Sequence, residues 1–226
     1  MDKYPNITVD AVVFTYIREK LHILLIKRNV KPFKGRYALA GAFIKEDETA
    51  NDAVSRMLKE ETGLNLDYLE QLYTFTDVNR DPRQRIISIA HYGLINYANQ
   101  TLNSSEHADV VGWVEVKEAF KKDLAFDHKE IMQLALQRLR NKLRYEPIGF
   151  ELLPKFFTMG ELYSLYSAIL DVGLDRRNFN RKILGFGLLK ETTFKSSGHV
   201  GRQAKMYEFD KVTYDRLKNI GFNFEL

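Results

Sequence analysis

The chain has 226 residues, of which 45% are hydrophobic and 28% are charged, and this composition is typical of a globular protein with one large or two modest domains. It contains no cysteine, which excludes disulfides and thiolate metal sites. No apolar run approaches the ~20 residues of a membrane span, and the N-terminus lacks the apolar segment of a signal peptide, so we expect a cytoplasmic protein without a membrane partner.

The formal net charge of +4 is unevenly distributed along the chain. Between Arg176 and Lys205, eight basic residues stand against a single acid, Glu191, so the rest of the chain is slightly acidic. Such an asymmetry is expected of a surface that binds a polyanion such as nucleic acid. The alternative is a solvated surface on which basic residues cluster by chance.

Strand and helix patterns are interspersed in the first two thirds of the chain. Apolar runs predict strands at residues 7–16, 22–27, 69–75, 86–94 and 110–116. Apolar residues three and four apart predict helices at residues 49–62 and 127–143, with a short helix near 118–122 and Gly63 as a C-cap. This order predicts an α+β fold, a mixed sheet sandwiched between helices. Pro147, Gly149 and Pro154 then mark a boundary, so we expect domains at residues 1–148 and 149–226.

The segment from Leu39 to Leu64 resembles the Nudix signature. That pattern reads Gly, five residues, Glu, seven residues, Arg-Glu, an aliphatic residue, any residue, Glu-Glu, any residue, Gly and an aliphatic residue. Ala42 takes the place of the first glycine. The positions that match are Glu48, Arg56, Leu58, Glu60, Glu61, Gly63 and Leu64. The resemblance implies a Nudix fold for most of residues 5–145.

The same motif lacks one of the carboxylates that hold the catalytic magnesium ions in Nudix hydrolases. Nudix hydrolysis uses magnesium ions, and carboxylates at positions 57, 60 and 61 would converge on one helix face to hold them. Position 57 is Met57, which cannot bind a hard cation. We therefore expect no catalytic residues and no required cofactor. A magnesium ion on Glu60 and Glu61 is the alternative to a surface or loop-anchoring role for these two carboxylates.

The loop at residues 77–85 contains the run Arg80-Asp81-Pro82-Arg83 ahead of a predicted strand. This run resembles Nudix proteins that handle ADP-ribose and related sugar nucleotides, and guanidinium groups suit phosphates and sugar hydroxyls. The residues expected to bind an effector in the adjoining cleft are Arg28, Arg36, Glu48, Arg80 and Arg83. A solvated hairpin loop is the alternative.

The C-terminal region predicts a winged helix. A helix at residues 161–170 and a short turn precede a second helix at residues 176–184, for which Asp175 is the expected N-cap. Phe179, Ile183 and Leu184 of the second helix are expected to face inward. Strands at residues 188–194 and 205–209 then flank a basic loop, the wing.

Helix, short turn and basic helix is the layout in which the second helix enters the major groove of DNA. Arginine and asparagine pair with guanine and adenine, and cations bind phosphate. The expected DNA-binding residues are Arg176, Arg177, Asn178, Asn180, Arg181, Lys182, His199, Arg202 and Gln203. A small structural subdomain with a basic surface helix is the alternative.

A degenerate Nudix domain followed by a winged helix resembles the Nudix-related transcriptional regulators of bacteria. The resemblance implies a homodimeric repressor that binds operator DNA and responds to ADP-ribose, in NAD metabolism, or to a sugar such as L-arabinose. The carboxylate missing at Met57 favours a sugar over a metal-bridged diphosphate. The main alternative is an active Nudix hydrolase of ADP-ribose type with an accessory nucleic-acid-binding domain, and a third is an RNA-binding module.

Overall fold

The computed structural model describes residues 5–66, 68–99, 102, 108–195 and 204–226. The chain forms two compact units. The N-terminal unit comprises residues 1–17 and 21–138, and the C-terminal unit comprises residues 18–20 and 139–226. Within the described ranges, no helix has both the length and the apolar character needed to cross a membrane.

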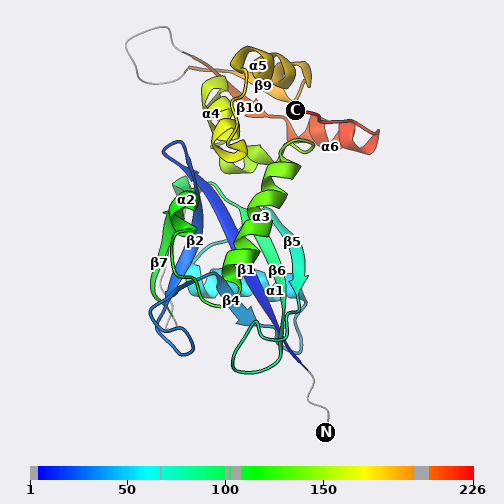
Figure 1. Cartoon of the computed structure of the whole chain (residues 1–226). Helices are drawn as coiled ribbons and strands as arrows, with labels where there is room; N and C mark the ends of the chain where they lie inside the picture. Colours follow the sequence, from blue (N-terminus) through cyan, green and yellow to red (C-terminus); the bar gives the residue numbers. More distant parts are fainter. Residues whose placement is uncertain (1–4, 67, 100–101, 103–107, 196–203) are drawn as a thin grey trace. The chain divides into compact units, whose positions relative to one another are not determined.

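A mixed seven-stranded sheet forms the centre of the N-terminal unit (Figure 1). Its strands are β1 (Asn6–Ile17), β2 (Lys20–Arg28), β3 (Tyr37–Ala38), β4 (Ala40–Phe43), β5 (Tyr68–Phe75), β6 (Ile86–Leu94) and β7 (Ala108–Glu115). Strand β1 pairs in parallel with β6, whereas β1–β4, β2–β7 and β5–β6 are antiparallel pairs. The main path through the sheet is β3-β2-β1-β6-β5. The predicted mixed sheet is confirmed.

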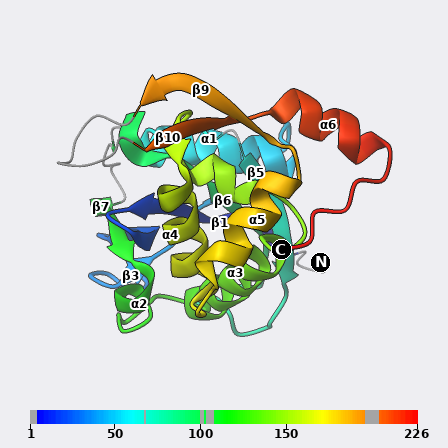
Figure 2. The same cartoon turned by 90° about the horizontal axis from the view of Figure 1, so that it is seen from above.

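Helices cover both faces of this sheet. In Figures 1 and 2 the sheet lies between α1 (Ala50–Thr62) and α3 (His128–Lys142). Helix α1 begins where Thr49 and Asp52 form a capping box, and it ends at Gly63, whose φ of 76° is the left-handed conformation expected of a C-cap. The short helix α2 (Val116–Ala119) begins two residues before the position predicted for it, and a 3₁₀ turn covers Tyr97–Asn99.

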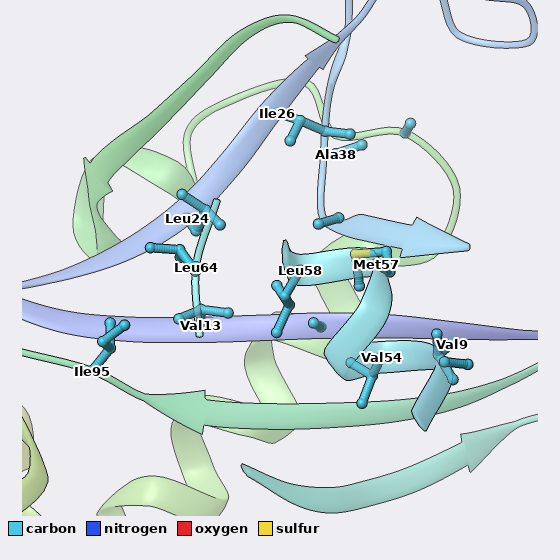
Figure 3. Packing of buried hydrophobic residues seen from close by; sticks show 14 residues of the cluster. Val9, Val13, Leu24, Ile26, Ala38, Val54, Met57, Leu58, Leu64 and Ile95 are labelled. Atoms are coloured by element: carbon cyan, nitrogen blue, oxygen red, sulfur yellow. The ribbon is translucent and has the colours of Figure 1, made fainter. Parts of the chain in front are cut away.

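The apolar face of α1 packs on the sheet. Figure 3 shows Val54, Met57 and Leu58 of α1 in one cluster with Val9 and Val13 of β1. Each of these side chains is at most 1% exposed, and burying one such side chain contributes roughly 1.5–3 kcal/mol. The helix is therefore fixed with its opposite, polar face turned away from the sheet.

The C-terminal unit is a winged helix, as predicted. Its elements are a 3₁₀ turn (Ile148–Leu152), β8 (Phe157–Thr158), α4 (Met159–Leu170), α5 (Arg176–Gly185), β9 (Leu189–Lys195), β10 (Lys205–Phe209) and α6 (Lys211–Asn219). The three strands form an antiparallel sheet in the order β8-β10-β9. Helices α4 and α5 bury apolar side chains that include Leu165, Tyr166, Phe179 and Ile183.

Capping residues set the ends of these helices. Thr158 and Glu161 form a capping box, so α4 begins two residues before the predicted start. The Asp175 carboxylate accepts a hydrogen bond of 2.6 Å from the Asn178 N–H at the start of α5, and this confirms the predicted N-cap. Leu184 is 48% exposed, so its predicted inward orientation is wrong: it follows the buried Ile183 by one residue and is rotated off the buried stripe.

Candidate ligand pocket and nucleic-acid interface

A cavity of about 570 Å³ opens in the N-terminal unit, which is within the size range of small-molecule sites. Side chains from β1, β2, β4, α1 and the loop before β6 line it, together with Phe126 and His128 at the start of α3. Of the five expected effector residues, Arg28, Arg80 and Arg83 line this cavity.

Arg80 lines the pocket and is bound to two carboxylates. Its Nε and Nη2 donate to the Asp127 carboxylate at 2.8 and 2.7 Å, and Nη2 also donates to Asp10 Oδ2 at 3.2 Å. The Arg80 side chain is only 4% exposed. These nitrogens therefore anchor the loop to Asp10 of β1 and to Asp127 just before α3, and Arg80 also lines the pocket.

His128 completes this buried group. Its Nδ1 accepts a hydrogen bond of 2.9 Å from the Leu39 N–H, and its Nε2 lies 3.5 Å from Asp10 Oδ1. Burial lowers the pKa of His128 below its ordinary value. The ring is therefore neutral, with its proton on Nε2 directed at Asp10. Sequence reasoning did not identify Asp10 or His128, although Asp10 is a lone acid within a strongly apolar strand.

Two arginines face one aromatic ring beside the pocket. The guanidinium carbons of Arg28 and Arg83 lie 5.0 and 5.7 Å from the centre of the Phe126 ring. Arg83 also binds the Asp81 carboxylate through Nε and Nη2, at 3.0 and 2.7 Å. Burial, and then the positive charge of Arg83, lower the pKa of Arg28. Two guanidinium groups that share one aromatic ring, with the charge of Arg28 disfavoured by that of Arg83, are suited to binding an anion.

The structure does not bring Arg36 or Glu48 into the pocket, which corrects the expectation for both residues. Arg36 forms an exposed ion pair of 2.9 Å with Asp123. Glu48 is bound by Arg56 through two hydrogen bonds and also accepts one of 3.1 Å from the Lys45 N–H. The hydrogen bonds from Arg56 lower the pKa of Glu48 to about 2. Glu48 therefore ties its loop to α1.

The three helix positions that would hold magnesium have different surroundings. Met57 is 1% exposed and belongs to the apolar cluster of Figure 3. Glu60 is exposed and pairs with Arg56 at 3.2 Å. Glu61 lines the pocket, where burial and then the negative charge of Glu60 raise its pKa to about 7. Among the described residues, no group of three potential metal-binding side chains occurs.

The basic face of α5 forms the candidate nucleic-acid interface. The residues exposed on it are Arg176, Arg177, Asn178, Arg181 and Lys182. Asn180 is half-buried, and its buried Oδ1 has no hydrogen-bond partner in the described part of the chain. His199, Arg202 and Gln203 of the wing lie outside the described residues.

A sheet between two helices with a charged pocket beside α1, and a winged helix with a basic second helix, define a Nudix domain joined to a DNA-binding module. The NUDIX domain family model matches residues 7–135, and that of the NrtR DNA-binding winged helix domain matches residues 149–209. The chain therefore belongs to the family of Nudix proteins that carry an NrtR-type winged helix.

Relatives with both domains are similar over nearly their whole length. The ADPR responsive transcriptional repressor NtrR of Acinetobacter baylyi is 36% identical over 97% of this chain and 86% of its own. The crystal structure of Shewanella oneidensis NrtR with a 27mer DNA has a TM-score of 0.81 at 30% identity, over 96% of this chain and 97% of that one. The cocrystal structure of the NUDIX domain of Shewanella oneidensis NrtR with ADP ribose has a TM-score of 0.58 at 35% identity. The match covers 61% of this chain and 90% of that one.

Proposed function

We propose that this protein is a transcriptional repressor that binds duplex DNA through α5 and ADP-ribose in the pocket of its N-terminal unit. The observation that carries the proposal is the pair of guanidinium groups of Arg28 and Arg83 on the Phe126 ring. A diphosphate offers these cations a counter-charge, whereas a neutral pentose such as L-arabinose does not. The relatives described above are associated with ADP-ribose and DNA, which supports the same choice.

Ligand choice is tested by calorimetric titration of ADP-ribose, NAD and L-arabinose into the purified protein. We expect ADP-ribose to bind most tightly, and Arg28→Met to weaken its binding by about 1.5–3 kcal/mol, the value of a hydrogen bond to a charged group. Arg36→Met is the matched control, because Arg36 lies outside the pocket. Equal losses for the two variants, or tighter binding of L-arabinose, would contradict the proposed site.

The Nudix domain in this proposal binds ADP-ribose without hydrolysing it. Met57 lies in the apolar cluster, and Glu60, which also lines the pocket, is paired with Arg56, so α1 supplies two carboxylates to the pocket where the motif has three. No cofactor is required for binding. Incubation with ADP-ribose and Mg²⁺, followed by chromatography for AMP, is the test. A turnover near ~1 s⁻¹, which is ordinary for an enzyme, would favour the alternative of an active hydrolase.

DNA binding is tested with a duplex selected from a random pool by the wild-type protein. Replacing Arg176 with alanine should cost ~1–3 kcal/mol of binding free energy if this residue contacts a base edge. Lys129→Ala, an exposed lysine on α3, is the control and should leave affinity unchanged. If the wild-type protein selects no sequence, the proposed function is wrong.

We further propose that the protein binds its operator as a homodimer. A single winged helix contacts few base pairs, and two-fold symmetry doubles the sequence that is recognised. The selected duplexes should then be palindromes whose half-sites lie one or more helical turns apart, about 34–36 Å per turn. Sedimentation of the protein–DNA complex gives the stoichiometry, and one chain per duplex would exclude the dimer.

A further inference from the structure

Tyr163 of α4 contacts both the turn that precedes α5 and α5 itself. Its hydroxyl donates a hydrogen bond of 2.9 Å to the Leu174 carbonyl in the turn. Its ring meets the Phe179 ring nearly edge-on, with centres 5.7 Å apart and planes at 75°. The guanidinium carbon of Arg176 lies 5.4 Å from the centre of the same ring. One half-buried side chain thus contacts three points around the start of α5.

Arg176 is an exposed cation at an electrostatically unfavourable position. The first turn of α5, residues 176–179, holds Arg176 and Arg177 and no acidic residue. The N-terminal end of a helix carries partial positive charge, which disfavours cations there by ~0.3–1 kcal/mol each. The negative face of the Tyr163 ring offsets part of this cost for Arg176. Arginines at such a position are suited to binding an external anion or a base edge.

The contact with Tyr163 restrains Arg176 without using up its hydrogen-bonding capacity. A free arginine side chain samples many rotamers, and fixing it costs free energy on binding. A guanidinium group held on an aromatic face keeps its N–H donors available, whereas an ion pair with a carboxylate would occupy them. A Cβ added at Gly160, one turn before Tyr163, would lie 3.4 Å from Arg176 Nη2. The Arg176 guanidinium therefore lies close to the first turn of α4.

We propose that Tyr163 is a positioning residue for DNA recognition. Its ring orients the Arg176 guanidinium toward the DNA, and its hydroxyl fixes the turn from which α5 starts. This inference rests on the proposed DNA-binding function, and it adds a residue that does not itself touch a base. Tyr163 acts through Arg176, so its effect on DNA binding requires Arg176 to be present.

The test is a double-mutant cycle between Tyr163→Met and Arg176→Ala, measured on the duplex selected by the wild-type protein and on its single-base variants. We expect Arg176→Ala to weaken binding by roughly 5- to 150-fold and to relax discrimination at one base pair. Tyr163→Met should relax discrimination at that same base pair. In the Arg176→Ala background, the change at Tyr163 should have little further effect. Fully additive effects would overturn the proposal.

Tyr163→Phe separates the contacts of the ring with Phe179 and Arg176 from the hydrogen bond of the hydroxyl. The phenylalanine keeps the ring and loses the hydroxyl, so we expect it to retain the base discrimination that Tyr163→Met loses. Tyr145→Met, at a tyrosine that is 51% exposed, is the control for the chemical change. Thermal denaturation of every variant excludes unfolding as the cause.

The outcomes distinguish the two proposals from each other. If the wild-type protein selects no duplex, the DNA-binding function and this inference both fail. If the wild-type protein binds a selected duplex and Tyr163→Met discriminates between bases as the wild type does, the inference fails alone. If Tyr163→Met weakens binding to every duplex equally, including a non-specific one, its role is structural and the inference also fails.

Discussion

Gly41 of β4 lies directly against Asp10, and both residues line the pocket. A Cβ at this position would come within 2.3 Å of Asp10 Oδ1 and 3.0 Å of the Val9 carbonyl oxygen. We therefore expect Gly41→Ala to lower the free energy of unfolding by ~1–3 kcal/mol, because the backbone or Asp10 must move. Gly112→Ala in β7 is the control, since its Cβ would meet no atom within 4 Å. Urea denaturation that shows equal stability of the two variants would contradict this account.

Arg80 and Arg83 are close in sequence but have different surroundings, and they provide a second comparison. Removing the Arg80 guanidinium leaves Asp10 and Asp127 buried without their cation, so Arg80→Met should destabilise the fold by ~3–5 kcal/mol. Removing the Arg83 guanidinium affects one buried carboxylate, Asp81, which keeps a hydrogen bond from the Arg83 backbone N–H, so Arg83→Met should cost less than Arg80→Met. Calorimetric unfolding of both variants measures the difference, and similar melting temperatures would rule out the anchoring role of Arg80.

At the scale of single elements, the packing of α1 determines the surroundings of position 57. Met57 lies on the apolar stripe of α1 and not on its polar face. Returning a carboxylate to position 57 would bury it among aliphatic side chains, so Met57→Glu should destabilise the protein by about 3 kcal/mol or more and create no hydrolase. Met57→Leu, of similar volume, should cost less than about 1.5 kcal/mol. A stable Met57→Glu variant that releases AMP from ADP-ribose would show that this account is wrong.

Elements bounded by clear signals were predicted well. Strand β6 has the predicted limits because a charged loop precedes its apolar run, and α1 ends at the glycine expected to cap it. Helix α6 was not predicted, and none of its residues is buried. Strand β8 has only two residues, which is too short for alternation to be visible.

Site residues were predictable where they share a local pattern. Arg83 was expected at the pocket from the run before β6, and Arg28 because it flanks the presumed cleft, and both line the pocket. Asp10 and His128 were missed because their meeting depends on tertiary structure: more than a hundred residues separate them, and no local pattern records their contact. Arg36 and Glu48 were misplaced because nearby partners, Asp123 and Arg56, hold them elsewhere.

For the whole molecule, we predict that effector and DNA binding are linked. Helix α3 runs without interruption from His128, which lines the pocket, to Lys142, beyond the limit of the N-terminal unit. In a repressor that releases its operator, ADP-ribose should lower the affinity for the selected duplex. By thermodynamic linkage, the duplex should then lower the affinity for ADP-ribose by the same factor, typically ~5–150-fold. Equal affinities for ADP-ribose with and without the duplex would exclude regulation by the pocket.

The environment of Glu61 makes ligand binding a proton-exchange reaction. With its pKa raised to about 7 by burial and by Glu60, this carboxyl is about half protonated at neutral pH. A phosphate anion that enters the pocket alone favours the neutral acid, so the complex takes up protons from the buffer. A divalent cation favours the carboxylate, so an ADP-ribose–Mg²⁺ complex releases protons instead. Titration calorimetry in buffers of different ionisation enthalpy gives the sign of this exchange, and Glu61→Gln should abolish it. The direction of proton flow thus reports whether a metal ion accompanies the ligand.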